Sequence, residues 1–382
     1  MLIDFPYIFF YLIMLLLSYE YHLSHKKKII NIAIVLTFVF CGLRAPVVGA
    51  DTWNYVRYLT GERAFYNSDE RELESLFLLY RHVICTITSY RVMVMLINTF
   101  LTLLPVCLLF LKFSRNVPLS CLMFFYLDCE LTYWVGLRQV LGLSIILLVY
   151  YYILTRMNDK GILYKILYLS IATFVSYFIH TICLLYGIIC ILSLLIPCIH
   201  RNLYIVLIII SFVFGIIYHS YVQIDIFQLY LNQQFTVWDR LSDYFDRDEQ
   251  LLMKWPLIRF SLVGIVSYMF IGKKWLNHPI SKMFLVSIML YNVLFTLPLI
   301  HRLAYPLFIL GAILFTHAGE FKTNNILHKK QIANNIVVVL LLYLTYTHVM
   351  ENVDYSTKSS SRMHPYYFIF QDYSDHPSIN RF

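Results

Sequence analysis

Arginine and histidine side chains stand where the apolar runs of this sequence end or begin. Arg44 follows one such run, Arg138 opens another, and His180 ends a third. His301 and Arg302 stand together between two more runs. A guanidinium binds phosphate or carboxylate through a planar fork of donors, and a neutral imidazole is the usual general base. The pattern therefore predicts a site for an anion, with acid–base chemistry beside it.

The stretch "CGLRAPVVGADTWNYVRYL" holds the first of these arginines. Asp51, Tyr55 and Tyr58 are spaced i, i+4 and i+7, which predicts one face of a helix that begins near Asp51. Asp51 suits the N-cap of that helix, so its position alone does not require a catalytic role. Arg44 either snorkels to lipid phosphates or holds a ligand phosphate, and Tyr55 is either an interface aromatic or a ligand contact.

The other candidates lie at tight turns. Arg138 opens an apolar helix, where a positive charge opposes the helix dipole, so structure alone gives little reason for it. Arg302 resembles Arg138 in position, and Tyr305 follows it by three residues. His180 is either a satisfied histidine at the membrane interface or a general base. Together these residues bring cationic groups to one plane, which suits an anionic lipid head group.

The composition places these residues in a membrane protein. Of the 382 residues 60% are hydrophobic and only 14% are charged, against roughly 25% charged residues in a soluble domain. About 20 apolar residues span a bilayer. The sequence therefore predicts an all-α, polytopic fold with about twelve transmembrane helices, near residues 3–21, 29–43, 91–111, 117–135, 137–154, 163–179, 181–198, 203–219, 257–272, 283–299, 302–318 and 332–349.

The basic residues predict the orientation of these helices. If the loop "HLSHKKK" is cytoplasmic, alternation puts every lysine cluster inside, as the positive-inside rule requires. Arginine behaves differently, because only Arg115, Arg156 and Arg201 of 16 arginines fall inside. External arginines either pair with the acids of the loops or recognise an anionic ligand on the outer face. The net charge of +8 therefore reflects the basic residues that orient the helices in the membrane, and it does not predict nucleic-acid binding.

The external face is predicted to carry two long loops. They cover residues 44–90 and 220–256, with amphipathic helices near "TWNYVRYL", "LESLFLLYRHVICTIT" and "VWDRLSDYFDRDEQLLMKW". Residues 1–349 are expected to form a single transmembrane domain, followed by a polar, mobile extracytoplasmic tail over 350–382. The sequence has no phosphate-binding Walker loop, no HExxH or paired-histidine motif and no nucleophile elbow. We therefore expect neither a metal nor another cofactor.

Several segments together resemble one family. The series "LRAPVVGADTWNYVRYL", "ELESLFLLY", "LRQVLGLSI", "FIHTICLL" and "HRLAYPL" is similar to the EpsG family of Wzy-like polysaccharide polymerases, in the same order and over most of the chain. In the second segment the family often has a proline after the glutamate, where this chain has Ser75. The resemblance implies a GT-C-like glycosyltransferase in the bacterial cytoplasmic membrane, with its site facing the periplasm or the cell exterior.

The activity implied by this resemblance is the joining of oligosaccharide repeat units. The growing glycan would leave undecaprenyl diphosphate for the non-reducing end of another lipid-linked unit, as in the synthesis of O-antigen (lipopolysaccharide), capsule or exopolysaccharide. The expected partners are the undecaprenyl-diphosphate-linked oligosaccharide and membrane lipids. A chain-length regulator and a flippase of the same pathway are further candidate partners. The alternative activities are a flippase of lipid-linked oligosaccharide and a membrane O-acyltransferase.

The residues divide into two predicted sets. Arg44, Arg138 and Arg302 would neutralise the diphosphate leaving group, and His180 or Asp51 would take the proton of the acceptor hydroxyl. In the second set, Trp53, Tyr55 and Trp134 would stack on sugar rings. The predicted substrate-binding residues are Trp53, Tyr55, Glu74, Trp134, Gln139, His301 and Tyr305.

Overall fold

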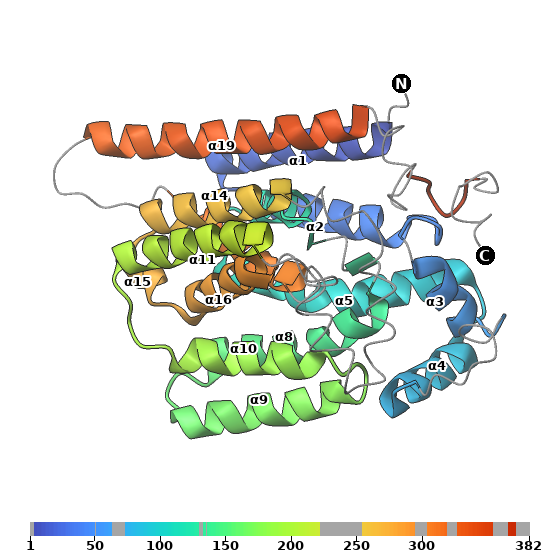
Figure 1. Ribbon diagram of the computed structural model, residues 1–382. Coiled ribbons are helices and arrows are strands. Elements are labelled where there is room, and N and C mark those ends of the chain that lie inside the picture. Colours follow the sequence, from blue (N-terminus) through green and yellow to red (C-terminus); the bar gives the residue numbers. More distant parts are fainter. Residues whose placement is uncertain are drawn as a thin grey trace. The chain divides into compact units, whose positions relative to one another are not determined.

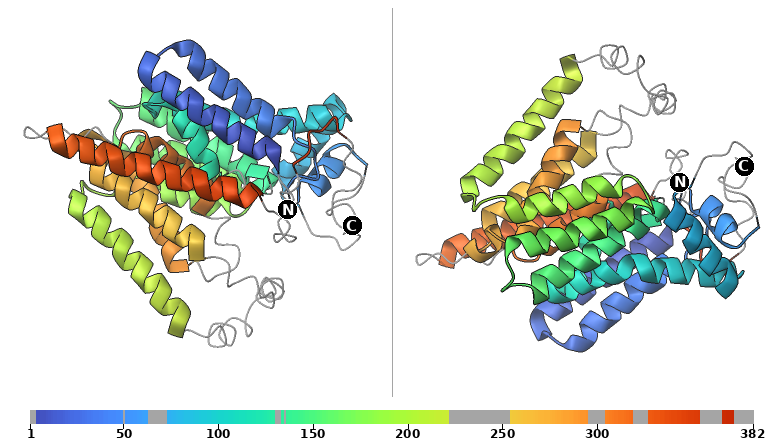
Figure 2. Two further views of the ribbon diagram at one scale, coloured as in Figure 1. Left: turned by 90° about the horizontal axis from the view of Figure 1, so that it is seen from above. Right: turned by 90° about the horizontal axis from the view of Figure 1, so that it is seen from below.

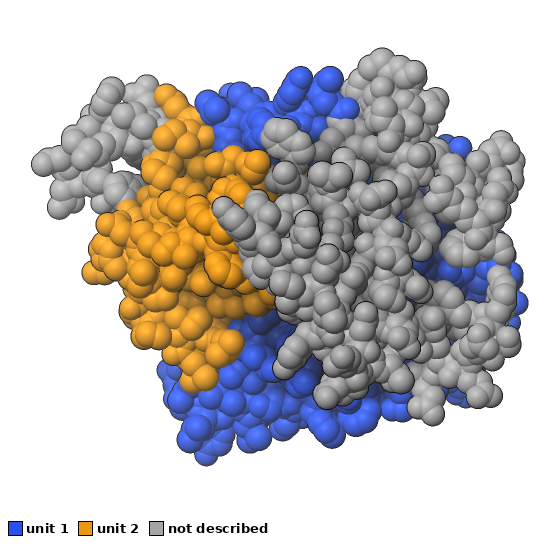
Figure 3. All heavy atoms as spheres, in the orientation of Figure 1, with its two compact units in different colours: residues 1–191, 338–382 blue, residues 192–337 orange. Residues whose placement is uncertain are grey.

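The computed structural model describes residues 4–49, 51–62, 73–129, 133–134, 136–221, 254–294, 304–318, 327–353 and 366–371. These residues form helices and turns without a β-strand, as expected for an all-α protein. The chain divides into two compact units, residues 1–191 with 338–382 and residues 192–337 (Figure 3). A single transmembrane domain over 1–349 stays a prediction.

The first unit contains the predicted site. Its helix α5 packs against α2 and α8, α8 packs against α9, and α1 packs against α2 and α6. Two further helices, α10 (Cys183–Leu195) and α19 (Leu327–Val353), run across the boundary between the units. The remaining helices of the first unit are α1 (Phe5–Ser24), α2 (Lys27–Gly42), α3 (Thr52–Leu59), α4 (Ser75–Ile87), α5 (Arg91–Phe113), α6 (Val117–Tyr126), α8 (Leu137–Arg156) and α9 (Ile162–Tyr177).

The second unit is built around α11 (Arg201–Tyr221), α14 (Lys254–Phe270) and α16 (Pro279–Leu294), which pack against one another. The short α15 (Lys273–Leu276), the 3₁₀ helix η2 (Tyr305–Phe308) and α18 (Ile309–Phe315) complete its described part. The loop 220–256 falls almost wholly outside the described residues.

Each apolar run of the sequence coincides with a helix, but their lengths vary. Among the described residues three helices, α1, α5 and α8, are long and apolar enough to cross a bilayer, and several shorter apolar helices accompany them. The run 117–135 was expected to be one helix, yet α6 ends at Tyr126. The chain turns there through Asp128, whose φ of 51° is left-handed. These helices agree with a membrane protein; twelve spans and a GT-C-like architecture stay predictions.

The two amphipathic segments of the first loop that was predicted to be external are the helices α3 and α4. Both lie at the same end of the first unit (Figure 1). The start of α4 is fixed by a hydrogen bond from the Leu76 amide to the carbonyl of Phe178, 3.0 Å away, at the end of α9. The opposite end of the unit carries the basic residues Lys112 and Arg156, in the last turns of α5 and α8. The charge pattern predicts that α3 and α4 are external.

A segment of the C-terminal tail returns to the end of α2. The Ala45 amide donates to the carbonyl of Tyr367 (2.7 Å), and the Ile369 amide donates to the carbonyl of Leu43 (2.8 Å). The Asp4 carboxylate accepts the Tyr366 amide at 2.8 Å. The tail was expected to be mobile, but residues 366–371 are held because they satisfy main-chain groups that α2 leaves unpaired where it ends.

Candidate functional site

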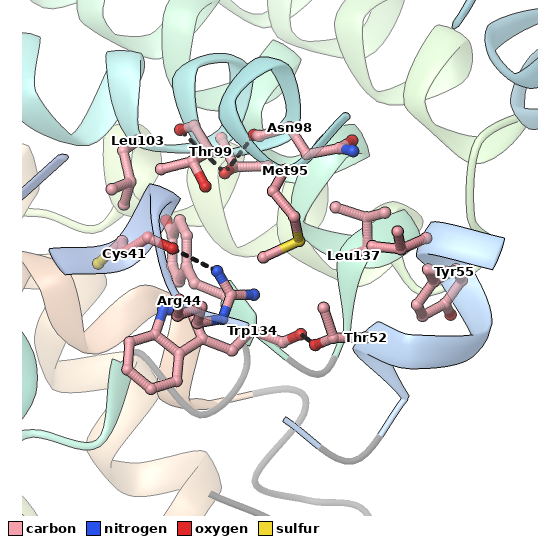
Figure 4. A pocket seen from close by; sticks show the side chains of 13 residues that line it. Cys41, Arg44, Thr52, Tyr55, Met95, Asn98, Thr99, Leu103, Trp134 and Leu137 are labelled. Atoms are coloured by element: carbon pink, nitrogen blue, oxygen red, sulfur yellow. Dashed lines mark hydrogen bonds between the residues drawn. The ribbon is translucent and has the colours of Figure 1, made fainter. Parts of the chain in front are cut away.

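A polar cavity lies at the predicted external end of the first unit. Helices α2, α3 and α5 and the turn before α8 supply its walls (Figure 4). Its volume of ≈ 20 Å³ is room for about one water molecule. Its lining residues are Cys41, Arg44, Thr52, Tyr55, Val56, Met95, Asn98, Thr99, Thr102, Leu103, Tyr133, Trp134 and Leu137.

Arg44 is the charged residue of this cavity, and its side chain is buried at 5% exposure. Its Nη1 donates to the carbonyl of Cys41 (2.5 Å), its Nε donates to the carbonyl of Val48 (3.3 Å), and its guanidinium lies 4.8 Å from the Trp134 ring (Figure 4). Burial lowers the pKa of Arg44 to about 10, so it is still a cation at neutral pH. Among the described residues no carboxylate forms an ion pair with it, so its charge is buried without a compensating anion.

The turn between α2 and α3 depends on Gly49. Its φ is +116°, a conformation that L side chains rarely adopt. A Cβ on Gly49 would lie 2.5 Å from the Thr52 hydroxyl, and that hydroxyl donates to the carbonyl of Trp134. Asp51 takes the N-cap position of α3 as predicted, but its side chain makes no capping hydrogen bond. The turn therefore ties α3 to the Trp134 side of the cavity.

Replacing Gly49 with alanine should disrupt this turn. The strained φ and the clash with Thr52 are expected to cost about 1–3 kcal/mol and to release Thr52 from Trp134. We expect a lower unfolding temperature for Gly49→Ala than for Gly161→Ala, because a Cβ on Gly161 meets only the Tyr164 ring, 4.0 Å away. Thermal unfolding of the two variants in the same detergent measures the difference, and equal temperatures would contradict this role of Gly49.

Arg138 joins a second group of predicted residues beside the cavity. Its Nη1 donates to the Glu74 carboxylate (2.6 Å), and its Nε donates to the Tyr55 hydroxyl (3.3 Å). The side chains of Arg138 and Glu74 are 20% and 18% exposed, so this ion pair is partly buried but still reached by solvent. Tyr55 also lines the cavity. The structure thus brings Arg44, Tyr55 and Arg138 together with Glu74, although α3, α4 and α8 are far apart in the sequence.

His180 lies in the turn between α9 and α10. The Ile182 amide donates to its Nδ1 (3.2 Å), so the neutral imidazole carries its proton on Nε2. In that tautomer Nε2 is a donor, which argues against the predicted role as a base. The same turn contacts the start of α4 through Phe178 and Leu76, which places His180 in the neighbourhood of Glu74.

The Gln139 side chain contacts α10 and not the cavity. It is 2% exposed, and its Nε2 donates to the Tyr186 hydroxyl of α10 at 3.0 Å. The Cys183 thiol of the same helix donates to the carbonyl of Gln139. Gln139 therefore joins α8 to α10 and does not line the cavity, although it follows Arg138 directly.

The two predicted tryptophans differ. Trp134 lines the cavity and is buried. Trp53, on α3, instead contacts guanidinium groups: Arg57 and Arg91 lie 5.8 and 4.9 Å from its ring centroid. Stacking of Trp53 on a sugar stays a prediction, and it would compete with these two cations.

Comparison with known proteins decides the family. The sequence profile of the EpsG family matches residues 27–368, which is most of the chain and includes both arginine sites described above. The chain belongs to the EpsG family. This family is associated with Wzy-like polymerases, and membership suggests a polysaccharide polymerase-like role. Searches of curated proteins and of solved structures found no match.

The ion pair that ties α3 to α5 in this EpsG-family chain should be sensitive to acid. Arg91 donates to both oxygens of Glu62 (2.8 and 2.6 Å), and this hydrogen bonding holds the pKa of Glu62 below 4.5. The folded pKa lies below the unfolded pKa, so the stabilisation is present above pH 4.5 and is lost as the pH falls through the folded pKa. The unfolding temperature should fall more between pH 5 and pH 3 in the wild type than in Glu62→Gln. Equal slopes would show that the pair contributes nothing.

The last group of predicted residues concerns the second unit. His301 and Arg302 lie outside the described residues, so their anion contact stays a prediction. Tyr305 begins η2 and is buried, with its hydroxyl 3.5 Å from that of Tyr291. Both tyrosines belong to an aromatic cluster with Phe260 and Phe308.

Sequence reasoning missed two residues of the candidate site, Arg81 and Asn98. Arg81, on α4, donates from Nε to the carbonyl of Tyr58 (3.1 Å) and covers its ring. Asn98, on α5, lines the cavity and accepts from the Tyr80 hydroxyl at 2.5 Å. The buried hydroxyl of Tyr133 lines the cavity and has no hydrogen-bond partner among the described residues. The signal for Asn98 was present, because "INTFLT" interrupts an apolar span with polar residues on adjacent turns.

Proposed function

We propose that this protein polymerises polysaccharide repeat units on the external face of the bacterial cytoplasmic membrane. The growing glycan, linked to a polyprenyl diphosphate such as undecaprenyl diphosphate, is transferred to the non-reducing end of another lipid-linked unit. The bond between the anomeric carbon and the phosphate oxygen breaks, and a glycosidic bond to the acceptor hydroxyl forms. The lipid diphosphate leaves with the bonding electrons, and the acceptor proton passes to a base.

The observation that carries this proposal is that Arg44 is buried with no carboxylate partner among the described residues. A buried cation without a carboxylate partner is costly, and an anionic ligand removes that cost. A diphosphate leaving group gains negative charge as its bond to the sugar breaks, so a fixed guanidinium stabilises the transition state more than the ground state. The buried donors of Tyr133 (the hydroxyl) and Trp134 (Nε1), which have no partner among the described residues, supply further hydrogen bonds.

The cavity must open for this chemistry, since a space of ≈ 20 Å³ does not admit a diphosphate. Two lining residues are joined by the hydrogen bond from the Thr52 hydroxyl to the carbonyl of Trp134, which movement of α3 would break. We therefore include an outward movement of the start of α3 in the proposal. Closure of α3 over the bound substrate then excludes water, which would otherwise hydrolyse the activated sugar.

We assign the base to Glu74. Its Oε2 is held by Arg138, and its Oε1 has no hydrogen-bond partner among the described residues. An acceptor hydroxyl can therefore donate to Oε1 while Arg138 fixes the orientation of the carboxylate. His180, with its proton on Nε2, then acts as a hydrogen-bond donor to the substrate rather than as the base.

The function can be tested in the organism that carries the gene. Deletion should remove the ladder of long surface polysaccharide on a gel while a single repeat unit is still displayed. Wild-type protein supplied in trans should restore the ladder, and the inactive variants described below should not. Loss of even the single unit would contradict the proposal and would indicate a flippase instead.

A further inference from the structure

An apolar groove runs along the predicted external half of α1 and α2, which lie side by side (Figure 2). Its volume is ≈ 560 Å³, within the range of small-molecule sites, and every side chain that lines it is apolar. The rings of Phe10 and Phe40 stack 4.3 Å apart in its wall. Phe5 and Phe9, also in the lining, are 68% and 67% exposed, so the groove opens sideways towards the predicted bilayer.

The groove and the cavity of Arg44 share a wall. Phe40 lines the groove, and the next residue, Cys41, lines the cavity and accepts the hydrogen bond of the Arg44 guanidinium. Phe368 lines the groove as well, and it forms the β-bridge with Arg44. Residues that line the groove are therefore direct neighbours of residues that contact the buried Arg44.

An acidic residue at the start of α1 holds the tail segment that lies against this wall. Asp4, just before α1, accepts the amide of Tyr366, and the Tyr366 ring stacks 4.6 Å from Phe40. The carboxylate thus helps to fix the tail segment against the groove wall. The combination of an apolar groove and a cation at its end is complementary to a hydrocarbon chain that carries an anion at its terminus.

We infer that the groove between α1 and α2 binds the isoprenoid chain of the lipid-linked substrate, with the diphosphate directed to Arg44. The inference rests on the proposed function, because it locates the carrier of that same reaction. In a polyisoprenyl diphosphate the anion is bonded directly to the chain, without a glycerol spacer. This matches the adjacency of Phe40 in the groove wall and Cys41 beside Arg44.

A photoreactive polyisoprenyl diphosphate bearing a diazirine in its chain tests the inference on the full-length protein in lipid nanodiscs. After irradiation, mass spectrometry should find the label on peptides that contain residues 5–13 and 36–40. Unlabelled polyisoprenyl diphosphate should reduce the labelling at least fivefold, whereas the same concentration of phosphatidylglycerol should not. Labelling spread over other helices, or equal competition by phosphatidylglycerol, would overturn the inference.

A matched pair of variants distinguishes the groove from the general lipid-facing surface. Leu36 lines the groove, whereas its neighbour Val35 is 58% exposed outside it. Leu36→Trp should fill the groove and reduce the labelling at least fivefold, with Val35→Trp unchanged. Equal labelling of both variants would refute the site, and thermal unfolding of each variant shows whether it is folded.

The inference and the proposed function can fail separately. If the label maps to the groove but the protein makes no polymer from lipid-linked repeat units, the groove stands and the polymerase function is wrong. If polymer forms while the label maps elsewhere, the function stands and the groove is wrong. A polymerisation assay of Leu36→Trp adds a second readout, since a blocked groove should raise KM about tenfold and leave kcat nearly unchanged.

Discussion

Replacing Arg44 with alanine is expected to lower kcat for polymer formation roughly 10²–10³-fold, the effect of removing one preorganised donor from a developing negative charge. Arg44→Lys should recover only part of the activity, because an ammonium keeps the charge but loses the planar fork that binds phosphate bidentately. The assay is the length distribution and yield of glycan made by equal amounts of folded protein.

A control separates this effect from the general charge of the external face. Arg57 also lies near the start of the loop that is predicted to be external, but its side chain is 27% exposed and lies within 3.9 Å of Glu62. Arg57→Ala should therefore retain most of the activity. Wild-type yields from Arg44→Ala, or equal losses from both variants, would remove the basis for placing the diphosphate at Arg44.

The buried charge of Arg44 should also couple the stability of the fold to the binding of an anion. Burial lowers the pKa of Arg44 to about 10, so the folded protein binds this proton less tightly than the unfolded chain. The stability associated with this shift is lost as the pH falls through 10, so at pH 7 the buried charge destabilises the fold. An anion at Arg44 relieves that cost. Pyrophosphate should therefore raise the unfolding temperature of the wild type and not that of Arg44→Ala; an equal rise in both would place the anion elsewhere.

Replacing Glu74 with glutamine is expected to lower kcat by roughly 10²–10⁴-fold, the usual contribution of a positioned general base, with little change in KM. The amide oxygen can still accept from Arg138, so the fold around α4 and α8 should persist. This makes the variant a clean test of proton transfer. Glu74→Ala removes the Arg138 pair as well and should also lower the unfolding temperature.

Arg138→Ala is the matched comparison for Glu74. It removes the group that orients the carboxylate but leaves the carboxylate itself, so it should retain more activity than Glu74→Gln. If Glu74→Gln kept more than a third of the wild-type rate, Glu74 would only position Arg138. The base would then be sought at Asp51, by the same test with Asp51→Asn.

The helices of this protein and their predicted external end follow from simple patterns. Apolar runs locate the helices, and the segregation of arginine from lysine places Arg44 and Arg138 at one end. The amphipathic spacing of "TWNYVRYL" predicts α3 residue by residue. These features are local, so periodicity and composition are sufficient to find them.

The contacts that build the site are not local and could not be predicted in the same way. Glu74 and Arg138 are 64 residues apart, and only the folded chain shows that they pair. The position of Arg138 at a helix N-terminus suggested a ligand, yet a carboxylate of its own chain already neutralises it. Arg44 was expected either to snorkel to lipid phosphates or to hold a ligand phosphate, and the folded chain shows it buried, without a carboxylate partner among the described residues. The bridge between Arg44 and Phe368 joins opposite ends of the sequence, beyond any short-range pattern.

The most direct test is polymerisation by the purified protein in proteoliposomes. The only substrate is a defined repeat unit on polyprenyl diphosphate, without nucleotide sugar or ATP. The proposed mechanism predicts a ladder of lipid-linked oligomers, with one free polyprenyl diphosphate released for each new glycosidic bond. A substrate that stays as single units, whether it remains in place or crosses the bilayer, would contradict the assignment as a polymerase.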